Sequence, residues 1–176
     1  MQVFLDCDGV LADFDAYASE ILGIHPREYE RRKHNDAELW AKLYAVEDYF
    51  FKLPKMHDAD ELVAGVEAMG FEPVILTGVP SHEGSDWAID QKTRWAQVHF
   101  PHLSIICCKS KDKFQAMVPG LHNVLIDDWD KHMHVWQEAG GTFILHTSAA
   151  KSLDELENVV YSMAYGHKQE LDDRRN

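Results

Sequence analysis

The stretch that most constrains the fold is the opening decapeptide, in which a short apolar run ends abruptly in two acids. The apolar residues 3–5 have high β-propensity, and Asp6, Asp8 and Gly9 follow them. This pattern predicts a buried strand that delivers two carboxylates into a loop. Because open parallel α/β sheets bind ligands at the carboxyl ends of their strands, Asp6 is expected at a ligand site.

Two carboxylates at this spacing suit phosphoryl transfer. Asp6 can attack phosphorus and form an aspartyl phosphate, while Asp8 can protonate the leaving oxygen and later deprotonate the attacking water. The two charges repel each other and an anionic substrate, so a hard dication such as Mg²⁺ is expected beside them. A polar turn at a strand end explains the same residues without any function, and on this motif alone both interpretations stay open.

Four more apolar runs alternate with helical patterns along the chain. They predict further strands at residues 73–77, 104–108, 123–128 and 142–146. Strands that alternate with helices in this way predict an α/β protein with a doubly wound parallel sheet.

The interval between the first strand and the next α/β unit is helical throughout and too long for a simple crossover. Residues 14–54 are therefore expected to form a small helical cap inserted after the first strand. Residues 1–13 and 55–166 then form the core domain, and residues 167–176 form a charged tail. Six aromatic residues of the insertion are candidates for the cap's own core or for a pocket above Asp6: Phe14, Trp40, Tyr44, Tyr49, Phe50 and Phe51.

Two acidic patterns resemble capping boxes at helix starts. Asp58 precedes Glu61 by three residues, and Ser152 precedes Glu155 by three residues. We expect Asp58 and Ser152 to cap the helices that follow them. The basic cluster from Arg27 to Lys33 is either a solvated helix face or a phosphate-attracting patch.

Polar residues also follow the later strands. Thr77 and Gly78 offer a hydroxyl and free backbone N–H groups, which are a common means of holding phosphate oxygens. The third strand ends in a lysine run in which one member is expected to balance the charge of Asp6 and a bound phosphate; the candidates are Lys109, Lys111 and Lys113. The fourth strand ends in Asp127 and Asp128, and because strand side chains alternate, one of them should face Asp6.

The composition and net charge of the chain limit the kinds of binding partner that we expect. A net charge of −13 argues against nonspecific binding to nucleic-acid polymers or to membrane surfaces. No apolar run is long enough to cross a bilayer, and the three cysteines lie in strand-like runs, which favours reduced thiols and a cytoplasmic protein. No histidine pair has zinc-ligand spacing.

The order of these strand-end motifs resembles that of the haloacid dehalogenase-like (HAD) hydrolases, from residue 2 to about residue 160. The resemblance implies that Asp6 is the nucleophile, Asp8 the acid and base, and Thr77 a phosphate-binding hydroxyl. It implies a phosphate-balancing lysine, for which Lys113 is favoured over Lys111. It also implies Mg²⁺ held by the Asp6 carboxylate, the Asp8 main-chain carbonyl and Asp128, with Asp127 as a helper.

Within that superfamily the chain is similar to the 5′(3′)-deoxyribonucleotidases. The likeness is carried by the opening Asp6–Phe14, by the aromatic stretch Tyr49–Pro54 and by Lys92–Trp95, whereas the loop Val79–Ser85 departs from the family. It implies a phosphomonoesterase for (deoxy)nucleoside monophosphates. The substrate-binding residues would be Phe14, Gly78, Lys92 and Lys111.

Other functions remain open. One is a HAD phosphatase or phosphomutase that acts on another small phosphate ester. A dehalogenase of this superfamily needs no metal and lacks the second acid, so Asp8 argues against that activity. An acidic binding protein without enzymatic activity is the alternative from a different class, and the oligomeric state is not predicted.

Overall fold

The structure is a computed structural model that describes residues 1–33, 36–80 and 85–173, so most of the divergent loop 79–85 lies outside the described residues. Five strands form one parallel sheet in the order β3-β2-β1-β4-β5. Their bounds are Gln2–Leu5 (β1), Val74–Gly78 (β2), Ser104–Cys108 (β3), Asn123–Asp127 (β4) and Thr142–Leu145 (β5). The predicted α/β fold with a doubly wound parallel sheet is confirmed.

The strand order places β1 at the centre of the sheet. The chain runs outward from β1 through β2 to β3, and then returns to the other side of β1 for β4 and β5. Leu5 pairs with Ile75 on one side and with Ile126 on the other, so Asp6 emerges between the ends of two neighbouring strands. This reversal of direction is where open α/β sheets bind ligands.

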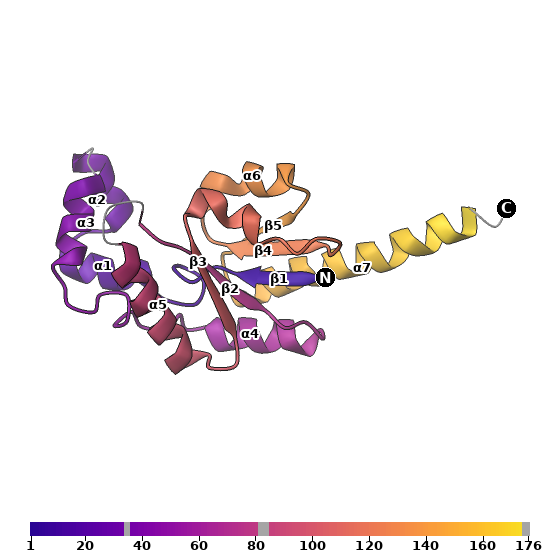
Figure 1. The fold of residues 1–176 in the computed structure, drawn as a ribbon, viewed down its shortest axis with the longest axis horizontal. Helices are drawn as coiled ribbons and strands as arrows, with labels where there is room; N and C mark the ends of the chain where they lie inside the picture. The colour runs from indigo at the N-terminus through magenta and orange to yellow at the C-terminus, as the bar shows by residue number, and fades with distance from the viewer. Residues whose placement is uncertain (34–35, 81–84, 174–176) are drawn as a thin grey trace.

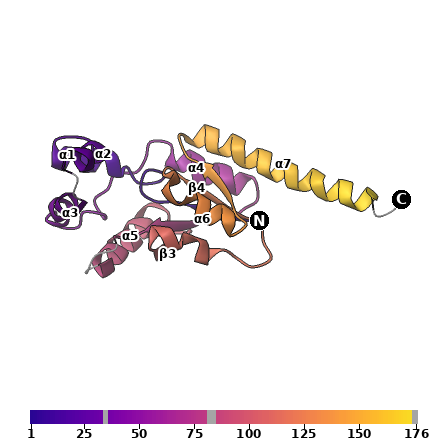
Figure 2. The same cartoon turned by 90° about the horizontal axis from the view of Figure 1, so that it is seen from above.

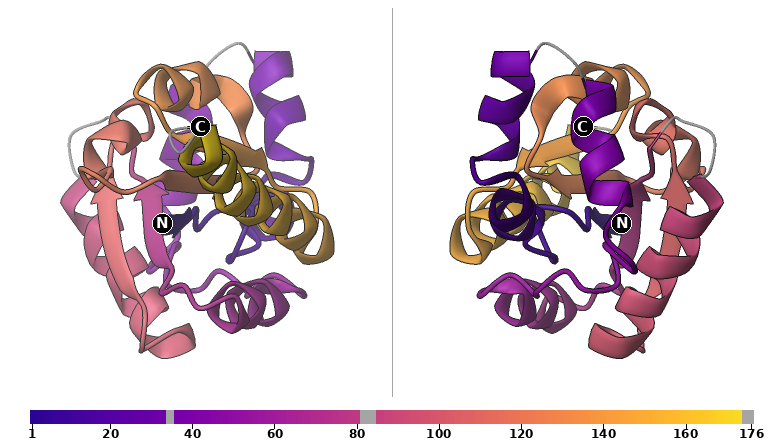
Figure 3. Two further views of the ribbon diagram at one scale, coloured as in Figure 1. Left: turned by 90° about the vertical axis from the view of Figure 1, so that its right-hand side faces the viewer. Right: turned by 90° about the vertical axis from the view of Figure 1, so that its left-hand side faces the viewer.

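Helices cover both faces of the sheet (Figures 1 and 3). Val3 and Leu5 of β1 point into the larger apolar cluster, whereas Phe4 points into a smaller one with Trp136. The larger cluster includes residues of α4 (Ala59–Ala68), α5 (Ser85–His99) and α7 (Ala149–Asp173). The smaller cluster lies under η1 (Ser110–Ala116) and α6 (Met133–Glu138), and the short η2 (Asp130–His132) precedes α6.

Three helices lie beyond the carboxyl ends of the strands, away from α7 (Figures 1 and 2). They are α1 (Phe14–Leu22), α2 (Pro26–Lys33) and α3 (Asp36–Tyr44). The Asp13 carboxylate accepts a hydrogen bond from the Ala16 N–H and so caps α1, while Gly23 ends it in the left-handed conformation that glycine adopts readily. These helices occupy the position expected of a cap, although the domain boundaries themselves stay a prediction.

The chain enters and leaves this helical segment at one place. Ala12 forms an antiparallel bridge with Lys55. The Asp13 N–H donates to the Pro54 carbonyl, and the Met56 N–H donates to the Leu11 carbonyl, both at 2.8 Å.

Asp58 stands at the predicted N-cap position of α4 but forms no capping box, and the prediction that Ser152 caps α7 is wrong. Asp58 makes no capping hydrogen bond to α4; its Oδ2 instead accepts from the Ala149 N–H, 2.7 Å away, at the start of α7. Helix α7 begins three residues before Ser152, which is buried within it and lies 2.9 Å from the His146 ring. The backbone of α7 continues to Asp173, into the segment predicted to be a tail. Among the described residues, no helix has the length and apolar character needed to span a membrane.

We expect Asp58→Ala to lower the free energy of unfolding by about 1–3 kcal/mol, because it leaves the buried Ala149 N–H without its side-chain acceptor. Urea unfolding followed by circular dichroism measures the change. Asp60→Ala is the matched control, since Asp60 is exposed on the same helix and its ion pair with Lys55 contributes at most about 1 kcal/mol. Equal losses in the two variants would contradict the assigned role of Asp58.

Candidate active site

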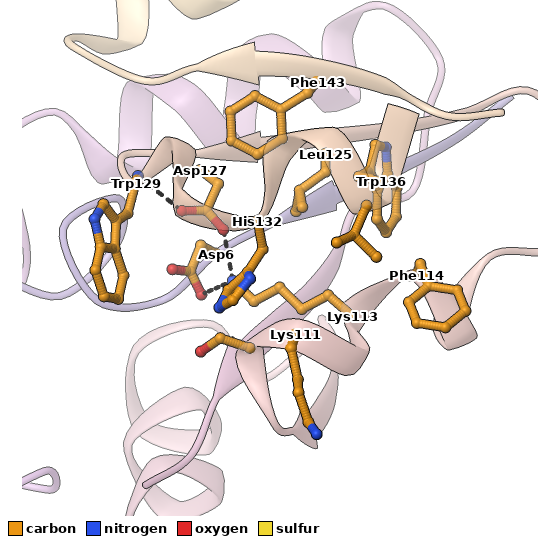
Figure 4. Close-up of a pocket in the computed structure, with 12 residues that line it drawn as sticks. Asp6, Lys111, Lys113, Phe114, Leu125, Asp127, Trp129, His132, Trp136 and Phe143 are labelled. Carbon is orange, nitrogen blue, oxygen red and sulfur yellow. Dashed lines mark hydrogen bonds and ion pairs between the residues drawn. The ribbon is translucent and has the colours of Figure 1, made fainter. Parts of the chain in front are cut away.

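Two carboxylates from neighbouring strand ends share one buried lysine. The Nζ of Lys113, in η1, lies 2.8 Å from Oδ1 of Asp6 and 2.7 Å from Oδ2 of Asp127 (Figure 4). Only 6% of Lys113 is exposed, and the two acids outweigh the effect of burial and raise its pKa. Of the three candidate lysines, Lys113 is therefore the one in contact with Asp6. Lys111 directs its nitrogen away from Asp6 (Figure 4).

A cluster of three acids surrounds the end of β1. Oxygen atoms of Asp6, Asp127 and Asp128 all lie within 4.8 Å of one another. The expectation that only one of Asp127 and Asp128 faces Asp6 is wrong, because β4 ends at Asp127 and Asp128 no longer follows the alternation of the strand. Burial and the nearby Asp6 raise the pKa of Asp127 to about 6 and that of Asp128 to about 7. Hard oxygen donors under mutual repulsion fit a small dication such as Mg²⁺.

The individual oxygens of the Asp127–Asp128 pair have different partners. Asp127 accepts from Lys113 with Oδ2 and from the Trp129 N–H with Oδ1. Asp128 is less buried and pairs at 3.3 Å with Arg27, which reaches it from α2. Since both Asp127 oxygens already accept hydrogen bonds, Asp128 is the member better able to take a further cation.

A second buried lysine contacts the Asp8 carboxylate. Lys92, in the middle of α5, places its Nζ 2.5 Å from Oδ2 of Asp8 and 2.9 Å from Oγ1 of Thr77. The same nitrogen lies 4.6 Å from the centre of the Phe50 ring, and only 1% of Lys92 is exposed. Burial raises the pKa of Asp8 although Lys92 opposes the shift, and Oδ1 of Asp8 is buried without a hydrogen-bond partner among the described residues.

Two glycines allow close approach at the strand ends. Gly9 has a φ of 80°, and a Cβ there would overlap the Asp128 carboxylate. A Cβ on Gly78 would overlap the hydroxyl of Ser110. Gly9 therefore provides both the sharp turn after β1 and the space for Asp128.

We expect Gly9→Ala to weaken Mg²⁺ binding by displacing Asp128, in addition to the strain of about 1 kcal/mol that alanine suffers at positive φ. Gly120→Ala is the matched control, because Gly120 has a φ of 79° but nothing within 4 Å of the added Cβ. Calorimetric titration of both variants with Mg²⁺ separates the two effects. Equal affinities would show that space at Gly9 does not serve Asp128.

A cavity of about 400 Å³ opens above these residues. Asp6, Asp8 and Asp128 line its floor, and Gly78 lies beside them. Of the six aromatic residues considered for this pocket, three line it from the helical segment, namely Phe14, Trp40 and Phe50. Tyr49 instead packs in the core of that segment against Phe14 and Tyr17.

A smaller cavity of about 40 Å³ adjoins Asp6 on the side of α6 (Figure 4). Asp6, Lys113 and Asp127 lie on one side of it, and Phe114 and Phe143 are among the apolar residues that line the rest. Its size suits ordered water.

The predicted site residues fall into two groups. Asp6, Asp127, Asp128 and Lys113 come together, as do Asp8, Thr77 and Lys92. Lys92 is not among the residues that line the larger cavity, whereas Phe14, Gly78 and Lys111 are. Sequence reasoning missed Trp129 and His132, which also line it; the available signal was that Trp129 follows the Asp-Asp pair directly and that His132 lies four residues after Asp128.

No protein-family model matches the chain, and comparison with curated proteins finds no match. Similar solved structures do exist. A candidate beta-phosphoglucomutase from Thermotoga maritima is 14% identical with a TM-score of 0.53, over 90% of this chain and 100% of that one. A hydrolase from Streptococcus pneumoniae TIGR4 is 15% identical with a TM-score of 0.51, over 89% and 97% of the two chains.

A dehalogenase is 14% identical with a TM-score of 0.50, over 81% of this chain and 82% of that one. At these identities the likeness concerns the fold. The chain thus has the Rossmann-like α/β fold of these structures.

Proposed function

We propose that this chain is a Mg²⁺-dependent phosphatase, which transfers the phosphoryl group of a small phosphate monoester to water through an aspartyl phosphate on Asp6. The observation that carries the proposal is the cluster of Asp6, Asp127 and Asp128, in which Asp6 and Asp127 share Lys113, and Asp6 and Asp128 line a cavity. Three clustered acids whose ion pairs among the described residues include only one buried cation favour the binding of further positive charge.

The residues fit a magnesium ion. Asp6 and Asp128 would hold it with their carboxylates, and the main-chain carbonyl of Asp8 would add a third oxygen. Asp127 would have a supporting role beside these ligands. When bound, Mg²⁺ supplies positive charge that offsets the repulsion between these carboxylates and the phosphate. Lys113 adds charge of the same sign at Asp6.

The reaction has two halves. In the first, an Asp6 oxygen forms a bond to phosphorus as the ester P–O bond breaks, and the Asp8 proton moves to the leaving oxygen. In the second, Asp8 takes a proton from water as that water attacks phosphorus, which releases phosphate and restores the Asp6 carboxylate. The raised pKa of Asp8 supports the first role, because the acid must carry a proton before the ester bond breaks, and its Oδ1 has no hydrogen-bond partner among the described residues.

We further infer that Lys92 positions Asp8 and Thr77 and does not itself contact the phosphate. Its ammonium is buried between their side chains and does not line the cavity. Thr77 is thereby fixed beside Asp8, and like Lys92 it is buried and does not line the larger cavity.

This role gives a kinetic expectation for Lys92→Met. The value of kcat should fall by about 100-fold, because Asp8 loses the partner that orients it, while KM changes little. A direct phosphate ligand would instead raise KM. Steady-state kinetics distinguish the two, and Lys92→Arg should recover part of the lost kcat. A large rise in KM with kcat unchanged would contradict the positioning role.

The finer proposal is that the substrate is a (deoxy)nucleoside monophosphate, which would make the protein a 5′(3′)-nucleotidase. The cavity volume of about 400 Å³ and the rings of Phe14, Trp40 and Phe50 support it, since a flat base can stack on them. The similarity to a candidate beta-phosphoglucomutase supports a phosphatase or phosphomutase for another small phosphate ester at least as well. The acidic cluster disfavours a dehalogenase.

Phosphate release from nucleoside monophosphates and sugar phosphates, with Mg²⁺ and with EDTA, tests the function. Mg²⁺-dependent release from any ester supports the phosphatase, and release concentrated on deoxynucleotides supports the nucleotidase. Isomeric sugar phosphates among the products would identify a phosphomutase. The absence of release from every compound would favour the acidic binding protein.

A further inference from the structure

The mouth of the larger cavity carries positive charge in a protein whose net charge is −13. Four cationic residues line it, and we call them the cationic rim: Arg27, Lys109, Lys111 and Lys131. They come from α2, from η1 and the residue before it, and from η2, so three separate parts of the chain converge on this opening.

The three lysines of the rim have no acidic partner among the described residues. Lys109, Lys111 and Lys131 are exposed and form no ion pair there, and Lys131 lies over the ring of Trp129 at 4.6 Å. In a chain with 30 acidic and 17 basic residues, unpaired cations gathered at one opening are unexpected. Among the described residues, the ion-pair partner of Arg27 is Asp128, at the floor of the same cavity.

The floor does not need this charge. Asp6, Asp127 and Asp128 are balanced by Lys113 and the dication of the proposed function, and Asp8, the proton donor of that function, lies against Lys92. The remaining acid that lines the cavity is Asp15, which pairs with His25 at 3.2 Å. The rim is thus surplus positive charge, and the scissile phosphate accounts for only part of it.

Arg27 reaches Asp128 at the cavity floor, but Lys111 of the rim extends away from the reacting atoms. Lys113 occupies the position against Asp6, whereas the Lys111 nitrogen is directed away from it (Figure 4). A group bound by Lys111 would therefore sit at the end of the substrate remote from the scissile phosphate.

We propose that the substrate carries a second anionic group, a phosphate or a carboxylate, and that the cationic rim binds it. This inference rests on the proposed function and narrows its substrate class to phosphate esters with two anionic ends. The aromatic rings of the cavity would then contact the frame that joins the two ends.

The test compares matched pairs of esters. In the first pair, adenosine 3′,5′-bisphosphate has one phosphate more than adenosine 5′-monophosphate. In the second pair, 3-phosphoglycerate has a carboxylate that glycerol 3-phosphate lacks. We expect kcat/KM for the doubly anionic member of at least one pair to be about tenfold higher, since two or more exposed ion pairs are gained. The preference should shrink as NaCl is raised, because salt screens exposed charges.

A charge-matched pair of variants locates the effect. In Lys109→Met/Lys111→Met the preference should fall at least about threefold, as expected for two lost surface charge contacts. The control is Lys52→Met/Lys151→Met, which removes the same charge from exposed positions that do not line the cavity. The preference for the doubly anionic ester should persist in this control. No preference within either pair, or the same preference in both variants, would overturn the proposal while leaving the phosphatase intact.

Calorimetry with Asp6→Asn and Mg²⁺ separates this inference from the proposed function. Tighter binding of a doubly anionic ester, lost in Lys109→Met/Lys111→Met, would support the anion site even if no phosphate were released. Equal binding of both members of each pair would overturn it.

Discussion

Replacing Asp6 by asparagine is expected to abolish turnover while leaving the fold intact. The amide has the shape of the carboxylate but is a poor nucleophile toward phosphorus, so kcat should fall by about 10⁴-fold or more. The protein should remain folded, because Lys113 keeps its 2.7 Å contact with Asp127 and the acidic cluster loses one negative charge. Phosphate release and thermal unfolding are measured on the same preparation.

The control is Asp154→Asn, which makes the same chemical change at an exposed position on α7. It should retain the activity of the parent protein. Comparable turnover by Asp6→Asn would falsify the nucleophile assignment.

Replacing Lys113 by methionine should produce the largest loss of stability. Lys113 is the buried cation that contacts both Asp6 and Asp127, so its removal leaves buried carboxylates uncompensated. We expect the free energy of unfolding to fall by about 3–5 kcal/mol in EDTA. Mg²⁺ should recover part of that loss, since it binds the same carboxylates only in the folded state.

Lys111→Met provides the comparison. Lys111 lies two residues before Lys113, and the substitution removes the same charge from a side chain that is exposed. Its effect should stay within about 0.5 kcal/mol. Urea unfolding of both variants, with EDTA and with Mg²⁺, gives the difference directly. Similar losses in the two would mean that Lys113 does not compensate the acidic cluster.

The fold was predictable because its signal is local. Each strand is a short apolar run with polar residues or turns at its ends, and each observed bound differs from the predicted one by at most one residue. The helix caps failed for the opposite reason. The partner of Asp58 is an N–H 91 residues away, and no pattern of neighbouring residues contains that contact.

The residues of the site divide in the same way, into those that local sequence predicts and those whose contacts are distant along the chain. Asp6, Asp127 and Thr77 lie within or directly after apolar strands, so sequence alone directs them to one edge of the sheet. Lys92 and Arg27 come from helices, and their partners are 84 and 101 residues away. Their roles depend on how the helices pack, which periodicity does not determine. The choice of Lys113 likewise depends on the 3₁₀ turn that buries it and leaves Lys111 exposed.

The bridge between Ala12 and Lys55 has a consequence for how such a protein can diversify. Because the chain leaves and re-enters the sheet at adjacent residues, the intervening helices can be lengthened, shortened or exchanged without moving β1 or α4. Phe14, Trp40 and Arg27 belong to that exchangeable part, whereas Asp6, Lys113 and Asp128 do not. The groups proposed to react with phosphate can thus stay the same in evolution while the specificity for the ester changes.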